Sequence, residues 1–269
     1  MITLIGLQMT YANGFEALCP VDLAFEPASF NVLLGPSGAG KSTLLRCVNL
    51  LNMPTGGTVE VQGVGCVNRD RSLQRRHRRA TAMIFQQHQL IRRHSALQNV
   101  LMGRLGHYHP LRTLFPFSRA DKLLALESLD RVGLIDKALE RIDNLSGGQQ
   151  QRVGIARGLT QQPSIMLADE PVASLDPSTS DKVLSLLQRI CREDGLTALV
   201  SLHQVELAKK YGDRIVGLAE GRVVFDGTAD ALDEETITDI YRDGAADSRA
   251  EDIDTGGQAS KEALAYRPP

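Results

Sequence analysis

Residues 35–43 read GPSGAGKST, and this run matches the phosphate-binding pattern G-x-x-x-x-G-K-[S/T] at every fixed position. Its glycines let the backbone curl so that successive N–H groups converge on phosphate oxygens. Lys41 adds a positive charge for the β and γ phosphates, and the Ser42 hydroxyl is placed to bind Mg²⁺. The residues expected to form this nucleotide cradle are Gly35, Pro36, Ser37, Gly38, Ala39, Gly40, Lys41, Ser42 and Thr43.

A pair of acids follows an apolar run in SIMLADEP, residues 164–171. Asp169 is placed to hold Mg²⁺ directly or through a water, and Glu170 to polarise a water for in-line attack on a γ-phosphate. Plain turn or capping chemistry is the alternative for two such acids, and the glycine loop upstream disfavours it. The two motifs alone do not separate ATPases, GTPases and kinases.

A second candidate anion site lies in LSGGQQQRVGIARGL, residues 145–159. Here a serine and two glycines open a helical pattern, and a helix start exposes backbone N–H groups that bind anions. The chain therefore carries two phosphate-binding helix starts that are far apart in sequence, which raises the question of whether one nucleotide meets both.

Short apolar runs alternate with helical patterns around these motifs, which predicts an α/β fold with a mainly parallel sheet. The expected helices span 41–51, 147–160, 177–192 and 205–210, and the third begins with Asp176 as its cap and a proline. The apolar residues of that helix lie on one side. The expected strands span 3–9, 21–25, 30–34, 58–61, 81–85, 164–168, 197–201, 214–218 and 222–225.

The stretch from about 88 to 144 differs, because it shows helical patterns at 96–105, 119–132 and 135–141 and no confident strand. We interpret it as a helical lobe inserted into the α/β domain. The tail from 243 to 269 has few apolar anchors and is predicted to be disordered. Residues 69–79, RDRSLQRRHRR, are interpreted as a solvated strand or helix edge.

The bulk properties are those of an ordinary soluble protein of 269 residues with a net charge of -2. This charge gives no reason to expect a nucleic-acid partner. No apolar run approaches the ~20 residues needed to cross a bilayer, and the start is interpreted as a strand and not as a signal peptide. The scattered cysteines, with no C-x-x-C pair, are expected to be reduced thiols.

The order of the motifs resembles the ATP-binding subunits of ATP-binding-cassette (ABC) transporters over residues 1–242, and LSGGQ is that family's own signature. The resemblance implies a P-loop NTPase (RecA-like) core with a parallel sheet. It also implies an N-terminal antiparallel β subdomain and an inserted α-helical subdomain at about 88–145.

Further site residues follow from this resemblance by position. Tyr11 resembles the aromatic residue that stacks on adenine. Gln86 resembles the Q-loop glutamine, which senses Mg²⁺ and the attacking water, with Gln87 as the alternative register. His203 resembles the switch histidine at the γ-phosphate, and Asp176 the D-loop aspartate of the subunit interface.

The same resemblance implies a head-to-tail homodimer, in which each ATP lies between the glycine loop of one chain and the signature of the other. The signature residues expected to meet the partner's ATP are Ser146, Gly147, Gly148 and Gln149.

Because no membrane span is expected, transport implies separate integral-membrane permease subunits that dock on the helical subdomain, at the cytoplasmic face of the inner membrane. A solute-binding protein is implied indirectly. Residues 103–134 and 200–227 are similar to the ATP-binding subunits of phosphonate and phosphite importers. Amino-acid importers, envelope exporters and soluble ABC proteins acting on DNA or ribosomes remain alternatives, and a small-molecule kinase is disfavoured by LSGGQ.

Overall fold

A central sheet runs through the protein, whose computed structural model describes residues 1–86, 89–109 and 116–242. Its strand order is β10-β9-β3-β8-β7-β6, and all neighbours are parallel except the β9–β10 pair. This confirms the α/β expectation. The strands are β3 (Phe30–Leu34), β6 (Thr81–Ile84), β7 (Ile165–Ala168), β8 (Thr197–Leu202), β9 (Arg214–Ala219) and β10 (Arg222–Gly227).

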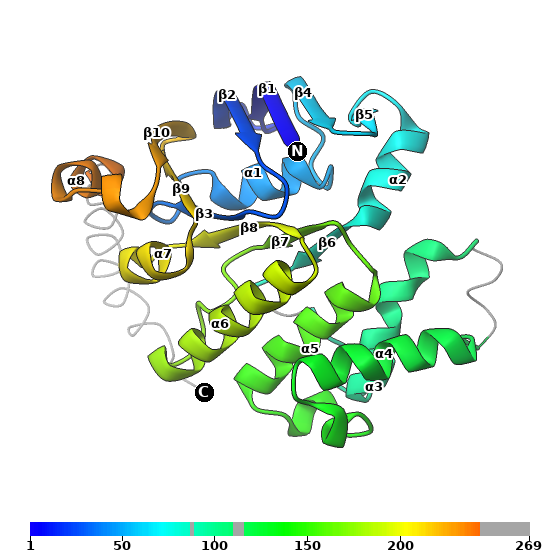
Figure 1. Cartoon of the computed structure of the whole chain (residues 1–269). Coiled ribbons are helices and arrows are strands. Elements are labelled where there is room, and N and C mark those ends of the chain that lie inside the picture. Colours follow the sequence, from blue (N-terminus) through cyan, green and yellow to red (C-terminus); the bar gives the residue numbers. More distant parts are fainter. Residues whose placement is uncertain (87–88, 110–115, 243–269) are drawn as a thin grey trace, which may run out of the picture.

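A second, antiparallel sheet with the order β2-β1-β4-β5 lies beside α1 (Figure 1). It confirms the N-terminal antiparallel β subdomain. The short β5 had no sequence signal, because a two-residue strand shows no periodicity. The strands are β1 (Ile2–Thr10), β2 (Glu16–Phe25), β4 (Gly56–Val61) and β5 (Gly65–Cys66).

Helices α1 (Lys41–Val48), α5 (Gly147–Thr160), α6 (Pro177–Glu193), α7 (Val205–Tyr211) and α8 (Glu234–Tyr241) pack around the central sheet. The predicted bounds of α5 are confirmed. Helix α1 ends three residues before the predicted end at 51, because Leu50 takes a left-handed conformation with φ 55°. The N–H of Leu51 then bonds back to the carbonyl of Arg46 and closes the helix end. Helix α8 was not predicted.

The inserted stretch is helical, as expected, with α3 (Ala96–Leu101), the 3₁₀ helix η1 (Met102–His107) and α4 (Arg119–Arg131). The helix predicted at 135–141 is wrong. Only the 3₁₀ turns η3 (Ile135–Lys137) and η4 (Ile142–Asn144) form there. The carbonyls of Ala138 and Glu140 accept hydrogen bonds from Leu97 and Ala96, so this backbone pairs with the segment that opens α3.

The arginine-rich segment forms a helix, α2 (Arg71–Ala80). The Asp70 side chain caps it by accepting hydrogen bonds from the N–H groups of Ser72 and Leu73. Only His77 is buried, and its Nε2 lies 2.7 Å from the carbonyl oxygen of Val48, at the end of α1. The arginines stay on the surface, which agrees with the predicted solvated edge.

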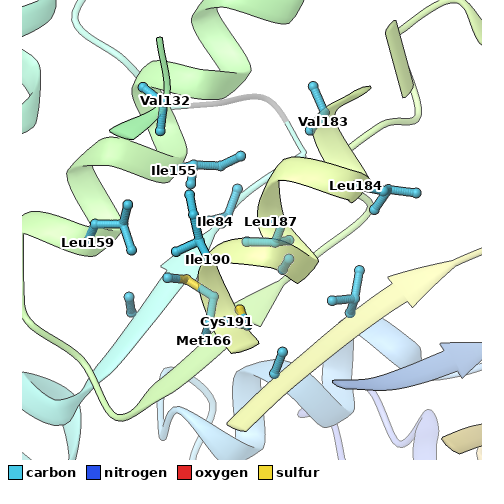
Figure 2. Close-up of a cluster of buried hydrophobic side chains, with 14 of the residues drawn as sticks. Ile84, Val132, Ile155, Leu159, Met166, Val183, Leu184, Leu187, Ile190 and Cys191 are labelled. Atoms are coloured by element: carbon cyan, nitrogen blue, oxygen red, sulfur yellow. The ribbon is translucent and has the colours of Figure 1, made fainter. Parts of the chain in front are cut away.

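The largest apolar cluster lies between the central sheet, α5 and α6 (Figure 2). In Figure 2, Ile155 and Leu159 of α5 lie beside Ile190 of α6, with Met166 of β7 below. The predicted apolar face of α6 is confirmed, since its members are all buried: Val183, Leu184, Leu187, Ile190 and Cys191.

All four cysteines of the chain are free thiols. Within the described ranges, no helix has both the length and the apolar character needed to span a bilayer.

Candidate functional site: a phosphate cradle at the carboxyl edge of the sheet

The glycine loop connects β3 to α1 and takes a shape that side chains would prevent. A Cβ on Gly35 would lie 2.2 Å from the carbonyl oxygen of Leu218 on β9. Gly40, at the start of α1, has φ 97°, and a Cβ there would lie 2.7 Å from the carbonyl oxygen of Ala17. Both glycines are therefore required by close backbone packing and by a left-handed conformation.

Lys41 is 3 % exposed and folds back over this loop. Its Nζ donates hydrogen bonds of 2.7 Å to the carbonyl oxygens of Gly35 and Pro36. Burial lowers the pKa of Lys41, while the nearby carboxylates of Glu170 and Asp169 act to raise it. The ammonium group thus lies in the loop's concave side, within the electrostatic reach of both acids.

Asp169 follows β7 and is held by hydroxyls from two other elements. Its Oδ1 accepts hydrogen bonds from Ser42 of α1 at 2.6 Å and from Ser201 of β8 at 3.0 Å. Arg46 Nη2 lies 3.7 Å from its Oδ2. The carboxylate is 4 % exposed, so these contacts fix its direction toward the glycine loop. A serine hydroxyl and a carboxylate that meet in this way form a set of hard oxygen ligands, which suits Mg²⁺.

Glu170 has an unusual backbone conformation for a residue with a side chain, with φ 44°. Its N–H donates to Ser201 Oγ at 2.8 Å, and this bond holds the left-handed turn in place. Strained residues of this kind cost about 1–3 kcal/mol and cluster at functional sites. Ser201 therefore orients both acids at once.

Gln86 and His203 lie at the same edge of the sheet. Gln86 comes two residues after β6, and His203 follows β8 directly, between the strands that carry the glycine loop and the acids. Both residues are exposed. Since the carboxyl ends of parallel strands meet at one edge, the topology brings these positions to the side of the sheet that holds Lys41 and Asp169. Gln87, the alternative register, lies outside the described residues.

Tyr11 lies where β1 ends and contacts the first turn of α1. Its hydroxyl shares a hydrogen bond of 3.2 Å with Thr43 Oγ1 and accepts one of 3.2 Å from Asn52 Nδ2. The side chain is partly exposed. An aromatic ring therefore stands next to the glycine loop on the side of the antiparallel sheet.

The signature segment opens α5 with a capping box. Ser146 Oγ accepts from the N–H of Gln149 at 3.4 Å, and Gln149 Oε1 accepts from the N–H of Ser146 at 2.9 Å. The N–H groups of Gly147 and Gly148 have no acceptor in the part of the chain that the structure describes. These two free donors at a helix start point a positive dipole outward.

One chain does not bring the two anion sites together. The residues that line the hollow at the start of α5 come from the end of α4, from α5 and from α6, and none of the described residues among them belongs to the glycine loop. Asp176 caps α6 nearby by accepting from the N–H of Thr179 at 3.0 Å, and its bonds to Thr179 lower its pKa. The role of Asp176 as a helix cap is confirmed.

Ser201, Arg46 and Asn52 belong to this site and were not predicted as site residues. Ser201 is a polar residue inside an apolar run, which is a weak signal. Arg46 stands four residues after Ser42 on α1, one helical turn away, and carries no signal beyond that spacing.

Among the described residues, no group of three or more His, Cys, Asp or Glu could hold a metal ion alone. Mg²⁺ commonly uses only one or two protein ligands together with phosphates.

The parallel sheet, the glycine loop and the acids at its carboxyl edge define a P-loop nucleotide-binding protein. A family model described as ABC transporter matches residues 18–173, which is more than half of the chain. The chain belongs to the ABC transporter family, as its ATP-binding cassette, and this confirms the resemblance drawn from the motifs.

Two curated relatives match most of the chain. The phosphonates import ATP-binding protein PhnC 3 of Nostoc sp. is 59 % identical over 241 residues, covering 90 % of this chain and 92 % of the relative. The phosphite import ATP-binding protein PxtA of Stutzerimonas stutzeri is 58 % identical over 235 residues, covering 87 % and 85 %. The names of both relatives agree with the resemblance found at 103–134 and 200–227.

A solved structure supports the same fold. A dimeric ATP-binding cassette in a post-hydrolysis state, bound to ADP and Pi, is 35 % identical, with a TM-score of 0.74 over 85 % of this chain and 99 % of that one. A second dimeric cassette structure gives the same identity and TM-score.

Proposed function

We propose that this chain is the ATP-hydrolysing, energy-coupling subunit of an ABC importer for phosphonates or related phosphorus oxyanions. The solute class is supported by the names of the relatives that are 59 % and 58 % identical. The observation that carries the ATPase proposal is the convergence of Lys41, Ser42, Asp169 and Glu170 at one sheet edge. We take residues 1–242 as the ATPase domain, with the helical insertion at about 88–145.

In this proposal, ATP lies in the loop of residues 35–43, and Lys41 exchanges its two carbonyl contacts for the β and γ phosphates. Mg²⁺ would be held by Ser42 and Asp169, with Gln86 as a further ligand, and would neutralise phosphate charge when bound. Glu170 polarises the attacking water. Its strained backbone, fixed by Ser201, supports this role.

The remaining site residues complete the cage around ATP. His203 contacts the γ-phosphate from the end of β8, and Tyr11 stacks on adenine beside α1. Both assignments rest on position, and the hydrogen bond between Tyr11 and Thr43 supports the second, since it keeps the ring next to the glycine loop.

We propose that two copies pack head to tail, so that each ATP is held by the glycine loop of one copy and the signature of the other. The separation of the two anion sites within one chain supports this arrangement. Ser146, Gly147, Gly148 and Gln149 would present the free donors of α5 to the γ-phosphate, and Asp176 would lie at the interface. The closed dimer then depends on the γ-phosphate.

The substitution Ser146→Arg tests the shared site. It places a long side chain at an exposed position outside the chain's own glycine loop. ATP binding by the monomer should remain near wild type, while ATP-dependent dimerisation and turnover should be abolished. Steady-state hydrolysis at the original rate would contradict the shared site.

The permease subunits are proposed to dock in a groove of about 850 Å³ between α2, β6, η1 and α5. Phe85 and Gln89, which flank the Gln86 segment, both line this groove. A segment that occupies it therefore presses on the backbone that carries Gln86. This contact would connect the membrane partner to the catalytic edge.

The arginine helix gives this groove its charge. Arg75, Arg78 and Arg79 line it, and none of the three forms an ion pair within the described ranges. Apolar side chains such as Leu51 and Met83 line it as well. This combination suits an amphipathic segment with acidic side chains.

Charge reversal tests the docking groove. Arg75→Glu should weaken association with the detergent-solubilised membrane subunits, whereas Arg71→Glu should not, because Arg71 is an exposed arginine of the same helix that does not line the groove. Association of Arg75→Glu as tight as that of Arg71→Glu and of the wild type would exclude Arg75 from the interface.

We place the subunit at the cytoplasmic face of the inner membrane as a peripheral protein, supplied indirectly by a solute-binding protein. No nucleic-acid partner is proposed. Uptake assays with phosphonate, phosphite and amino-acid solutes decide the substrate. Transport of amino acids without phosphonate would contradict the solute class while leaving the ATPase intact.

A further inference from the structure

The last described helix, α8, is fastened against the central sheet by its final turn. Ile240 is 1 % exposed and packs over Gly217 of β9. A Cβ on Gly217 would lie 2.7 Å from Ile240 Cδ1, so the missing side chain at this position lets the helix approach so closely. Because β9 pairs with β3, α8 is anchored to the strand next to the one that leads into the glycine loop.

Tyr241, the next residue, reaches across to the end of β8. Its hydroxyl donates a hydrogen bond of 2.7 Å to the carbonyl oxygen of His203, a partner that is 38 residues distant in sequence. The ring packs against the edge of the apolar cluster, near Ile237 and Val205. Burial, together with the charge of Glu206, raises the pKa of Tyr241 to about 12, so the hydroxyl remains a donor at neutral pH.

The side chain of His203 is not held by polar contacts of its own within the described part of the chain. Its side chain is exposed, and its imidazole has no hydrogen bond or ion pair with the residues that the structure describes. It lies in the turn between β8 and α7, at the sheet edge between the glycine loop and the acids. The hydrogen bond to the His203 carbonyl fixes the orientation of the peptide group between residues 203 and 204. This limits the backbone rotation that would carry the His203 side chain to another direction.

We propose that Tyr241 is a positioning residue for His203. The inference rests on the proposed role of His203 at the γ-phosphate. The phenol hydroxyl of Tyr241 fixes the backbone of the turn that carries His203. The contact between Ile240 and Gly217 holds α8, and therefore Tyr241, against β9. The imidazole of His203 is thereby oriented toward the nucleotide. Tyr241 does not touch the nucleotide itself.

Tyr241→Phe in the full-length chain tests this inference, because it removes one oxygen atom and keeps the ring in its packing. ATP turnover should be measured with the membrane subunits present. We expect kcat to fall about three- to tenfold, as for loss of one net hydrogen bond, with KM for ATP unchanged.

Tyr211→Phe is the matched control. Tyr211 is also a tyrosine at a helix end, and its hydroxyl bonds to the carbonyl and carboxylate of Asp181 on α6 without contacting His203. It should leave kcat unchanged while lowering the melting temperature. A kcat loss that tracks melting temperature in both variants would overturn the inference.

A double substitution separates this inference from the role on which it rests. If Tyr241 acts through His203, then Tyr241→Phe lowers kcat no further in a His203→Ala background. Equal fold losses in both backgrounds, or wild-type kcat in Tyr241→Phe, would overturn the inference and leave His203's role standing. Wild-type kcat in His203→Ala would instead remove the proposed role itself.

Histidine NMR provides a second readout that does not depend on residual activity. With six histidines in the chain, the His203 imidazole resonance can be assigned by substitution. The spectra are recorded with ATP on protein that carries Glu170→Gln, which is expected to stay in the ATP-bound state. The His203 resonance should shift or broaden when Tyr241→Phe is added to this protein, and it should stay in place when Tyr211→Phe is added. An unmoved His203 resonance in Tyr241→Phe would overturn the inference.

Discussion

Gly148 gives a prediction whose size follows from one distance. A Cβ at Gly148 would lie 2.5 Å from Thr179 Cγ2, where carbon atoms in contact normally lie about 3.5–4.0 Å apart. Because the β-branched Thr179 has few rotamers within a helix, we expect Gly148→Ala to move the start of α5 away from the start of α6 by about 1 Å. Overpacking of this kind costs about 1–3 kcal/mol of stability, which leaves a folded protein.

The functional effect should be larger than the effect on stability, because the displaced segment is the proposed donor to the partner's γ-phosphate. A misplacement of about 1 Å can lower a rate about a hundredfold. We therefore expect Gly148→Ala to lower steady-state ATP turnover by about two orders of magnitude, with monomer ATP binding retained.

Thr179→Ser should relieve the clash that Gly148→Ala creates, because it deletes the methyl group that meets the new Cβ. It keeps the hydroxyl that bonds to Asp176. The double variant Gly148→Ala/Thr179→Ser should recover most of the lost turnover, and Thr179→Ser alone should be close to wild type. Wild-type turnover in Gly148→Ala, or a double variant no more active than the single, would refute the steric reasoning.

Three further outcomes are expected. Glu170→Gln should trap an ATP-bound dimer, and size-exclusion chromatography that shows only monomer at saturating ATP would count against Glu170 as the catalytic base. Ser201→Ala leaves the Glu170 N–H without its acceptor and should cost about 1–3 kcal/mol in the free energy of unfolding, measured with denaturant; an unchanged midpoint would contradict this. Burial opposes ionisation of Asp121, but bonds from Ser118, Tyr108 and Arg104 outweigh it and lower its pKa from 3.8 to about 2. Its folded pKa is the lower one, so this stabilisation is present above pH 3.8 and is lost as pH falls toward 2. Asp121→Asn should flatten the dependence of melting temperature on pH in that window, and an unchanged slope would argue against the assignment.

Features with local causes could be predicted from the sequence. The bounds of α5 were predictable because Ser146 caps the helix with Gln149 three residues later, and those signals lie within one turn. The buried face of α6 followed from its apolar spacing. The strands β3 and β7 followed from short, continuously apolar runs.

Features with distant causes could not be predicted. The segment at 135–141 has a helical pattern, but backbone pairing with residues 96 and 97 prevents the helix. Helix α2 buries only His77, so it shows no apolar period. Helix α8 packs only Ile237, Ile240 and Tyr241 against the core, and one turn of apolar spacing is too short a pattern to predict a helix. Ser201 reaches Asp169 only because the register pairs Ala168 with Val200 across β7 and β8.

The most direct test of the central claim, that each ATP is held by two copies of the chain, is to mix two variants. Lys41→Ala disables the glycine loop and Ser146→Arg disables the signature, so each should be inactive alone. Only the mixed dimer contains an intact composite site, one of its two. An equal mixture should therefore recover about one quarter of wild-type turnover if the copies pair at random, and up to about one half if only mixed dimers form. A mixture no more active than its separate components would contradict the shared site.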